Sequence, residues 1–481
     1  VDAIQEVAIQ TSNFAAEFGQ VGGGLFNYTM KSGTNKFHGT GYDYFVNEAF
    51  NAAQPFTDNG SGGKVKTRAR RQDYGFTFGG PVIIPKIYDG HDKTFFFFNW
   101  EEFREFTLQN TTSQTVPIAA FRTGDFTRAL TGRTLCPSAA CTAAFADPRG
   151  NSILEGQVFD PNSTATVSGV RVRDAFVGNQ VPVARFDPVA AKIQALIPLP
   201  LGPASNALTL NYLPSYKADR VTHIPAVKID QNIGSKDKIS FYWSKTNTSR
   251  AISPGLGQAD GLPDPITTAI GTYVPAIVMR LNYDRTLTPT MLLHLGAGYQ
   301  YVDQGVPSVN TDGSIRNYDV EKELGLKGGI INRFFPTFTG LTFAGTGSGM
   351  KNFGSQSDTH NYTEKPTYNA SLTDVRGNHT IKYGAELRTE GYPAKNWGTA
   401  GGSYGFSYAQ TAQPYWNGQT ISGTTSGFPY ASFLLGLTSS TNVSLPTNPH
   451  YGNHSLGMYA QDTWKVNRKL TLDYGLRWDY A

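Results

Sequence analysis

The sequence predicts an all-β fold, namely a transmembrane antiparallel β-barrel of which this chain supplies a part. Apolar and polar residues alternate with period two along many segments, and the connections between these segments alternate between short and long. No apolar run approaches the roughly 18 residues of a membrane-spanning helix. Composition agrees, because 13% of the 481 residues are aromatic, 16% are charged and 52 are glycine. Aromatic girdles, tight strand packing and a lipid-facing strand surface produce such a composition.

Bulk properties exclude other classes of protein. A net charge of +4, from 41 basic and 37 acidic residues, is too small to indicate a nucleic-acid-binding surface. A hydrophobic content of 39% argues against intrinsic disorder. The chain starts at Val1 without a Met or an apolar leader, and it stops at Ala481 inside a predicted strand. We therefore expect a fragment that is cut at both ends.

Strands are predicted wherever one face is apolar and the other is polar. In the last segment, Leu472, Leu476 and Trp478 alternate with Asp473 and Arg477. About a dozen strands are indicated in this way, and we expect them to supply only part of a barrel, because a closed barrel has no free strand edge. The clearest segments are 40–48, 72–79, 94–104, 222–231, 237–247, 273–285, 290–301, 366–374, 379–390, 454–465 and 467–480.

Connection lengths favour a membrane barrel over the soluble alternatives, a β-sandwich or a propeller. An outer-membrane barrel has tight turns at its periplasmic end and long loops outside, whereas a sandwich has no reason to sort loops by end. Several apolar faces also begin or end in Tyr or Trp, as membrane interfaces require. The short connections are Asn232–Lys236, Leu287–Pro289, Arg376–Asn378 and Val466–Arg468, and the long ones run through roughly 110–221, 249–271, 305–361 and 392–437.

The polar strand faces carry charges that lipid would not tolerate. A midplane Arg or Lys facing lipid costs roughly 2–4 kcal/mol. We therefore expect these charges to face a wet lumen or a plug, and the aliphatic faces to contact lipid. An unpaired strand edge is not tolerated in hydrocarbon, so more strands should follow Ala481. The charged residues in question are Glu386, Arg388, Glu390, Asp473 and Arg477.

The insertion of about 110–221 is too long for an ordinary loop and should contain a short helix near 185–198. Asp187 is suited to be its N-cap, with Pro188 at the first helical position. We expect this helix to pack a large external loop. Its apolar stripe would consist of Val189, Ile193, Leu196 and Ile197.

Both cysteines, Cys136 and Cys141, fall within this insertion. A local disulfide outside the cytoplasm fits them. A two-thiol metal site fits less well, because no His lies nearby to complete it.

We find no catalytic constellation, so the prediction is a protein without enzymatic activity, cofactor or metal. His450 and His454 would lie about 13 Å apart on a strand, which is too far for a shared metal. Glu101 and Glu102 are adjacent on a strand and point to opposite faces. The segment Asp89–Lys93 has the composition of a turn. No phosphate-binding or dinucleotide-binding glycine motif occurs, and 345–349 lacks the serine of a nucleophile elbow.

The first forty residues differ from the rest. Three glycines permit a closely packed entry to a strand at Leu25–Met30, and Lys31–Asn35 turns into a second strand. This region resembles the plug–barrel junction of TonB-dependent outer-membrane receptors, particularly their Oar-like group. Phe14 and Phe18 replace the usual tyrosines. The matching positions are Asn13, Ala16, Glu17, Gly19, Gly22, Gly23, Gly24, Asn27, Thr29, Lys31, Ser32, Gly33, Thr34, Asn35, Phe37, His38 and Gly39.

Further stretches agree with the same group. They are Phe78–Pro81, Asp92–Phe97, Arg185–Ala191, Ala460–Lys465 and Leu470–Arg477. The resemblance implies a barrel of 22 strands that is filled by a plug. It also implies that residues 1–35 end the plug and that residues 36–481 begin the barrel. The partners it implies are outer-membrane lipid, an extracellular ligand and, through a missing N-terminal part, the TonB–ExbB–ExbD complex.

Two further functions compete with energy-coupled uptake. A passive porin or adhesion barrel predicts no plug, and a secreted glycan-active enzyme predicts a carboxylate pair in a cleft. The ligand itself is not predicted; an oligosaccharide, a peptide and a metal chelate all remain open. Aromatic residues of one loop favour rim packing over stacking on sugar rings, and these are Tyr404, Phe406, Tyr408, Tyr415 and Trp416.

Overall fold

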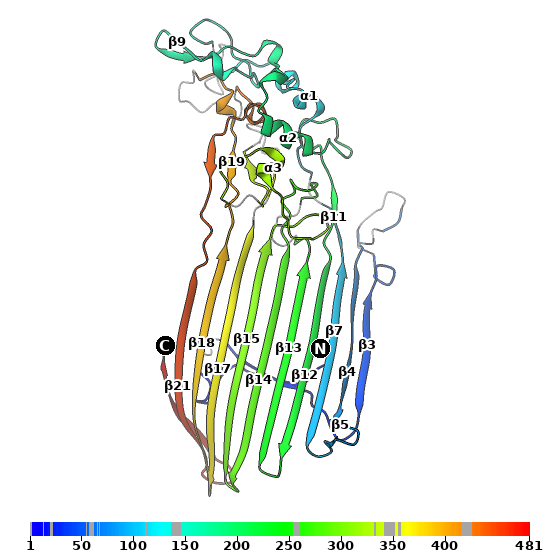
Figure 1. Cartoon of the computed structure of the whole chain (residues 1–481), viewed down its shortest axis with the longest axis vertical. Coiled ribbons are helices and arrows are strands. Elements are labelled where there is room, and N and C mark those ends of the chain that lie inside the picture. Colours follow the sequence, from blue (N-terminus) through cyan, green and yellow to red (C-terminus); the bar gives the residue numbers. More distant parts are fainter. Residues whose placement is uncertain are drawn as a thin grey trace.

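One tall, strongly curved antiparallel sheet forms the body of the molecule (Figure 1). The computed structural model describes residues 2–481 except 13, 20–22, 54, 57–61, 65, 67, 111–112, 136–145, 254–259, 331–332, 341–351, 355–356 and 415–425. Eleven of the described strands are hydrogen-bonded in the order β22-β21-β18-β17-β15-β14-β13-β12-β7-β4-β3. Their bounds are β3 His38–Val46, β4 Arg70–Pro81, β7 Thr94–Phe106, β12 Arg220–Ile233, β13 Asp237–Arg250, β14 Thr272–Thr288, β15 Met291–Pro307, β17 Asp358–Arg376, β18 His379–Asn396, β21 His450–Lys465 and β22 Thr471–Tyr480.

Each clear sequence segment corresponds to one strand of this sheet, so the predicted antiparallel barrel wall is confirmed. The boundaries differ most at β17, which begins at Asp358 although alternation marks only 366–374. Pro366 and the polar residues before it hide the alternation there, yet the strand pairs with β15 throughout. The sheet remains open, and β3 and β22 form its two edges.

The two faces of the wall separate as the alternation predicts. On β22, Leu476 and Trp478 are 77% and 55% exposed, whereas the side chain of Arg477 between them is only 11% exposed. Arg477 points to the side on which the N-terminal residues lie. The apolar face is therefore the outer one, and the charged face lines the interior.

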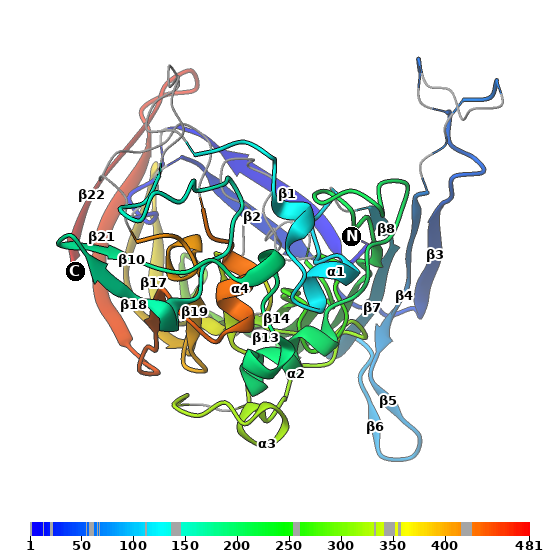
Figure 2. The same cartoon turned by 90° about the horizontal axis from the view of Figure 1, so that it is seen from above.

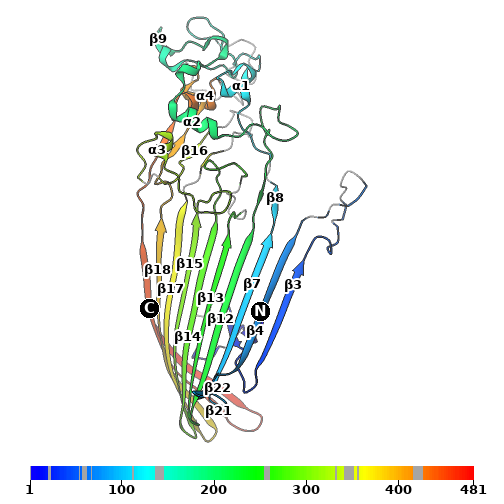
Figure 3. The same ribbon diagram turned by 45° about the vertical axis from the view of Figure 1, so that its right-hand side comes forward.

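Connections are sorted by end, which confirms the second prediction (Figures 1 and 3). Tight turns join β12 to β13, β14 to β15, β17 to β18 and β21 to β22 at the lower end. The chain between β4 and β7 also lies at that end and includes a small hairpin, β5 Ile83–Ile84 and β6 Tyr88–Asp89. Long segments leave the upper end.

The central strands are taller than a bilayer. β17 has 19 residues and β18 has 18, whereas a tilted strand crosses a membrane with about 9–11. On the outer face of β7, the series Phe96, Phe98, Trp100 gives way to Glu102, which is paired with Arg104. Because lipid excludes such charges, the strands continue above the membrane on the side of the long loops.

The long loops fold together into one body above the wall, which we call the cap: the described parts of 107–219, 251–271, 308–357 and 397–449. It holds the largest buried apolar cluster among the described residues. No described helix is long and apolar enough to cross a membrane. Elements of the cap are β8 Leu108–Asn110, α1 Ala119–Arg122, β9 Ala165–Val167, β10 Val170–Val172, α2 Pro188–Leu196, β11 Ser215–Lys217, α3 Val320–Leu324, β16 Thr337–Thr339, β19 Ser403–Gly405, α4 Pro429–Leu434 and β20 Ser440–Asn442, with short 3-10 helices at Thr127–Ala129, Pro161–Ser163, Val177–Asn179, Val183–Arg185 and Tyr408–Gln410.

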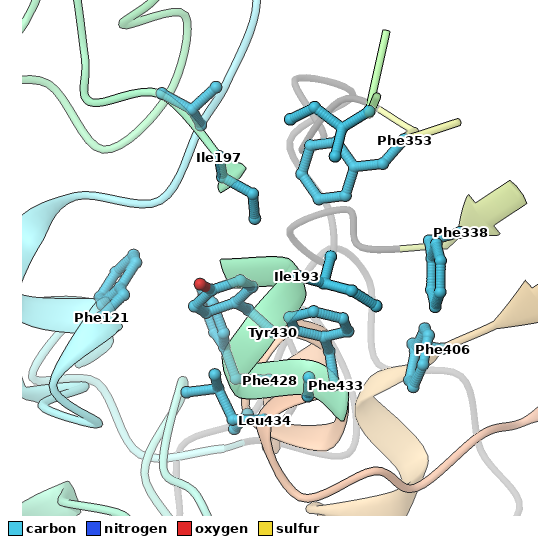
Figure 4. Packing of buried hydrophobic residues seen from close by; sticks show 14 of the residues in the cluster. Phe121, Ile193, Ile197, Phe338, Phe353, Phe406, Phe428, Tyr430, Phe433 and Leu434 are labelled. Carbon is cyan, nitrogen blue, oxygen red and sulfur yellow. The ribbon is translucent and has the colours of Figure 1, made fainter. Parts of the chain in front are cut away.

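The predicted helix is the centre of this cap (Figure 4). The Asp187 carboxylate accepts hydrogen bonds from the backbone N–H groups of Val189 and Ala190, each at 2.9 Å, as an N-cap should. Ile193 is fully buried beside Tyr430 and Phe433 of α4. The prediction that this helix packs the external loop is therefore confirmed.

A second, two-stranded sheet lies inside the curve of the wall. It pairs β1, Ile4–Gln10, with β2, Leu25–Met30. Seen from above, this hairpin crosses the concave side between the two edges of the large sheet (Figure 2). The strand predicted at Leu25–Met30 is present, and its partner is β1 and not the wall.

Candidate functional site where the N-terminal segment meets the barrel wall

The N-terminal segment, by which we mean the described part of residues 2–37, is the candidate site because it contacts the interior of the wall at widely separated points. One tie involves residues 15–19, which follow β1 and contact β18, β21 and β22. The other involves Asp2 and residues 30–35, which contact β3, β4, β12 and the turn before β7.

Glu17 is the centre of the first tie. Its carboxylate forms an ion pair with Nζ of Lys382 on β18. Its backbone N–H donates to Oε1 of Gln461 on β21 at 3.1 Å, and its carbonyl accepts from Nη1 of Arg477 on β22 at 3.0 Å. Three neighbouring strands therefore hold one residue of the segment.

The wall itself is arranged around this residue. Arg477 is oriented by Asp479, 2.9 Å from its Nε, and by Glu386, 3.5 Å from its Nη2. A Cβ atom at Gly19 would lie 2.3 Å from Nε of Arg477, so any larger residue at this position would displace the Arg477 side chain. The oriented Arg477 side chain and its close approach to Gly19 thus form a fitted seat for Glu17, in which charge-assisted hydrogen bonds are the strong contacts.

Asp2 makes the second tie. Its carboxylate is 2.9 Å from Nζ of Lys31 and accepts a hydrogen bond from Thr77 on β4 at 3.3 Å. It also accepts one from Thr40 on β3. These bonds, led by the one from Thr40, lower the pKa of Asp2 below its ordinary value. The carboxylate is therefore charged at neutral pH and fixes the start of the segment to the first two wall strands.

The junction motif continues from this point along the wall. Nζ of Lys228 on β12 donates to the carbonyl of Met30 at 3.0 Å. Gly33 passes so close to the wall that a Cβ there would lie 2.3 Å from the carbonyl oxygen of Phe96. Asn35 accepts from the backbone N–H of Asp92 at 2.8 Å, just before β7.

The predicted junction residues are therefore not one compact cluster. Lys31, Gly33 and Asn35 make the contacts just described, and Ser32 and Thr34 lie between them; the Thr34 hydroxyl donates to the carbonyl of Lys36 at 3.0 Å. Gly24 would place a Cβ 3.3 Å from the carbonyl of Gln10, whereas Gly23 has open space around it and Asn27 is exposed on β2. Gly22 lies outside the described residues.

Other predicted residues are placed as follows. Cys136, Cys141, Tyr415 and Trp416 lie outside the described residues, as do Asn13 and 345–349. Phe406 is buried, and Tyr404 stacks on Phe338 with ring centroids 5.6 Å apart, which is the packing that we favoured. Tyr408 is 40% exposed.

The pairing of the N-terminal segment with these particular wall residues was not predicted from the sequence. Arg477 and Glu386 were expected to face a lumen or a plug, and both are near the segment. Arg388 pairs with Glu386, Glu390 pairs with Lys365, and Asp473 accepts from Thr463. Asp2, Glu17 and Gln461 were not singled out as site residues. One feature of the sequence could have indicated this contact: Glu17 is acidic, and the inner faces of the later strands carry basic residues.

The two adjacent glutamates of β7 do not form a carboxylate pair. Glu101 and Glu102 point to opposite faces, as predicted: Glu101 accepts from Tyr42 at 3.1 Å, and Glu102 lies 3.2 Å from His223. Across the described part of the chain, no three His, Cys, Asp or Glu side chains are grouped to hold a metal. The site consists of reversible polar contacts, and what these can do is hold or release the segment.

The class of protein now follows from the architecture. A curved wall with an apolar outer face, a charged inner face, short turns below and long loops above is part of a transmembrane β-barrel. Residues 29–481 match the family described as "Outer membrane beta barrel domain", and the chain belongs to that family. It is accordingly a protein of the Gram-negative outer membrane, with membrane lipid around its apolar face.

Among solved structures, a transporter shares the fold of this chain, and two receptors are more distantly similar. The outer membrane transporter YddB from Escherichia coli is 11% identical, with a TM-score of 0.54; the match covers 100% of this chain and 43% of YddB. A mutant of the ferric enterobactin receptor PfeA from Pseudomonas aeruginosa is 9% identical, with a TM-score of 0.43 and coverages of 99% and 44%. The siderophore receptor PiuA from Acinetobacter baumannii is 12% identical, with a TM-score of 0.39 and coverages of 99% and 47%. The chain thus spans less than half the length of these structures. No curated protein matches it.

Proposed function

We propose that this chain is the central part of a TonB-dependent outer-membrane receptor that takes up a large ligand by energy-coupled transport. Residues 1–35 end its plug, and residues 36–481 begin a barrel that further strands complete. The observation that carries this proposal is the N-terminal segment inside the curve, which is seated at Glu17 and at Asp2. A segment held across the interior is expected of a gated receptor, whereas diffusion through a passive channel does not require one.

The nature of the contacts supports a removable plug. The segment meets the wall largely through hydrogen bonds and ion pairs, and water can replace these when the segment moves. The pulling partner would be the TonB–ExbB–ExbD complex, which would contact chain upstream of Val1.

The ligand class is an oligosaccharide, a peptide or a metal chelate, and membership of the Oar-like group remains part of the proposal. Uptake in whole cells tests the mechanism. Cells that express the full-length protein are given a labelled dextrin, a labelled peptide mixture and ⁵⁵Fe-enterobactin, with and without a protonophore. We expect accumulation of at least one probe, and its loss on addition of the protonophore. Accumulation that persists without a proton gradient would contradict energy coupling.

The alternative is a porin-like or adhesion barrel without energy coupling. It is favoured by one observation, the size of the cap, since a large folded outer surface also suits attachment. Deleting the plug separates the two functions. A receptor loses accumulation of its ligand, whereas an adhesin retains attachment to its target surface.

A further inference from the structure

The hairpin β5–β6 departs from the pattern of the lower turns. The tight turns at that end consist of residues 234–236, 289–290, 377–378 and 466–470, which are mostly Gly, Ser, Thr, Asn, Lys and Arg. The chain between β4 and β7 instead reads Val-Ile-Ile-Pro-Lys-Ile-Tyr from 82 to 88. Its isoleucines are exposed: 42% at Ile83, 47% at Ile84 and 80% at Ile87. Exposed apolar groups in this number mark a surface that meets something other than water.

The hairpin is built to hold its shape. Ile83 pairs with Asp89 and Ile84 with Tyr88, and the N–H of Ile87 donates to the carbonyl of Ile84 at 3.0 Å. At its base, the N–H of Val82 donates to the carbonyl of Thr94 at 2.9 Å. A second bond joins the side chains of Tyr88 and Thr94. The isoleucines are therefore presented on a fixed support.

The hairpin projects away from the barrel interior. From above, it extends from the convex side of the wall, opposite the side that holds β1 and β2 (Figure 2). Beside its base, Phe37, Phe78 and Phe96 form an aromatic cluster, with ring centroids 5.8 Å apart for Phe37–Phe78 and 5.6 Å for Phe78–Phe96. Phe78 is on the outer, lipid-facing side of β4 and is 45% exposed. The isoleucine surface therefore continues the lipid-facing surface at the level of the short turns.

We propose that residues 82–90 are a membrane anchor that lies in the periplasmic leaflet of the outer membrane. Ile83, Ile84 and Ile87 would contact acyl chains, and Lys86 at the tip would reach lipid phosphate. Phospholipid is the occupant that fits, because the patch is apolar, adjoins a surface that lipid already covers and carries a basic residue at its end. Such an anchor fixes the height and tilt of the wall beside its β3 edge.

Depth measurement by spin labelling tests this proposal. In the full-length protein with Cys136→Ser and Cys141→Ser, Ile87→Cys and separately Ile84→Cys are labelled with a nitroxide and reconstituted into phosphatidylcholine–phosphatidylglycerol vesicles. Lys236→Cys, in the turn between β12 and β13, is the matched control at the same end. Heat-dependent gel mobility confirms that each variant is folded.

We expect the labels at positions 84 and 87 to be relaxed by oxygen at least fivefold more effectively than by a water-soluble nickel complex. The label at position 236 should respond mainly to nickel. Equal nickel accessibility at all three positions would overturn the proposal. Broadening between labels on separate copies would overturn it as well, because the hairpin would then dock on a second protein molecule.

Discussion

Replacing Glu17 by Gln should loosen the N-terminal segment without unfolding the barrel. The side chains of Lys382 and Glu17 are 27% and 25% exposed, so their ion pair is neither fully solvated nor buried. Exposed pairs contribute about 0–1 kcal/mol, whereas breaking a fully buried one costs about 3–5 kcal/mol. The backbone bonds to Gln461 and Arg477 survive this substitution. We therefore expect the segment to lose about 1–2 kcal/mol of docking free energy, which is roughly a 5- to 30-fold rise in its released population.

Hydrogen–deuterium exchange measures that population. The amide of Glu17 is protected by its bond to Gln461 and exchanges when the segment leaves the wall. Peptides that cover 14–19 should exchange 5- to 30-fold faster in Glu17→Gln. Glu6→Gln is the matched control, since Glu6 is exposed on β1 in the same segment. Equal exchange rates in the two variants would refute the role assigned to the ion pair.

Three further predictions concern the junction and the cap. Gly33→Ala places a methyl group against the carbonyl of Phe96, and this overpacking should destabilise the docked segment by roughly 1–3 kcal/mol. Hydrogen–deuterium exchange at residues 30–35 should therefore be faster. Unchanged exchange would contradict the close approach of Gly33 to the wall. Phe433→Ala removes a ring that is 1% exposed and should destabilise the cap by about 3–5 kcal/mol. The cap should become protease-sensitive while the barrel keeps its heat-dependent gel mobility. Loss of the barrel's gel mobility together with the cap's protease resistance would contradict a separate cap core. Arg185 lies 3.0 Å from Asp160 and lowers the pKa of that carboxyl, so its stabilisation is present above about pH 4 and is lost as the pH falls through the lower folded-state pKa. Proteolysis of the cap from pH 7 to 3 should show this loss, and the increase in cleavage toward pH 3 should be smaller in Asp160→Asn than in the unsubstituted protein; an equal increase in both would contradict the role of this ion pair.

Alternation along the chain was sufficient to predict the wall because each strand separates lipid from a polar interior. Leu476 and Arg477 are neighbours in sequence, and a strand places them on opposite faces, of which one contacts lipid and the other faces the interior. The alternation of short and long connections further predicted which end of each strand lies on the periplasmic side of the membrane. The extra length of β17 could not be predicted, because above the membrane neither face needs to be apolar.

The packing of the cap and the contacts of the N-terminal segment join residues that are far apart in the sequence, so local sequence patterns do not predict them. α2 was predictable from Asp187 and Pro188, since a cap and a fixed φ act within one turn. Its partners in α4 could not be predicted, because Tyr430 hydrogen-bonds Gln194 across 236 positions. The seat of Glu17 joins residues that are 365 and 460 positions apart, so sequence could indicate a charged inner face but not its occupant.

The central claim is that the N-terminal segment and the chain before it close the barrel. Ion conductance across planar lipid bilayers tests this directly on the purified full-length protein and on a variant that lacks all residues up to Asn35. Heat-dependent gel mobility establishes that both are folded. We predict a closed full-length protein and a large, steady conductance for the variant. A full-length protein that conducts as well as the variant would contradict the claim and identify a passive channel.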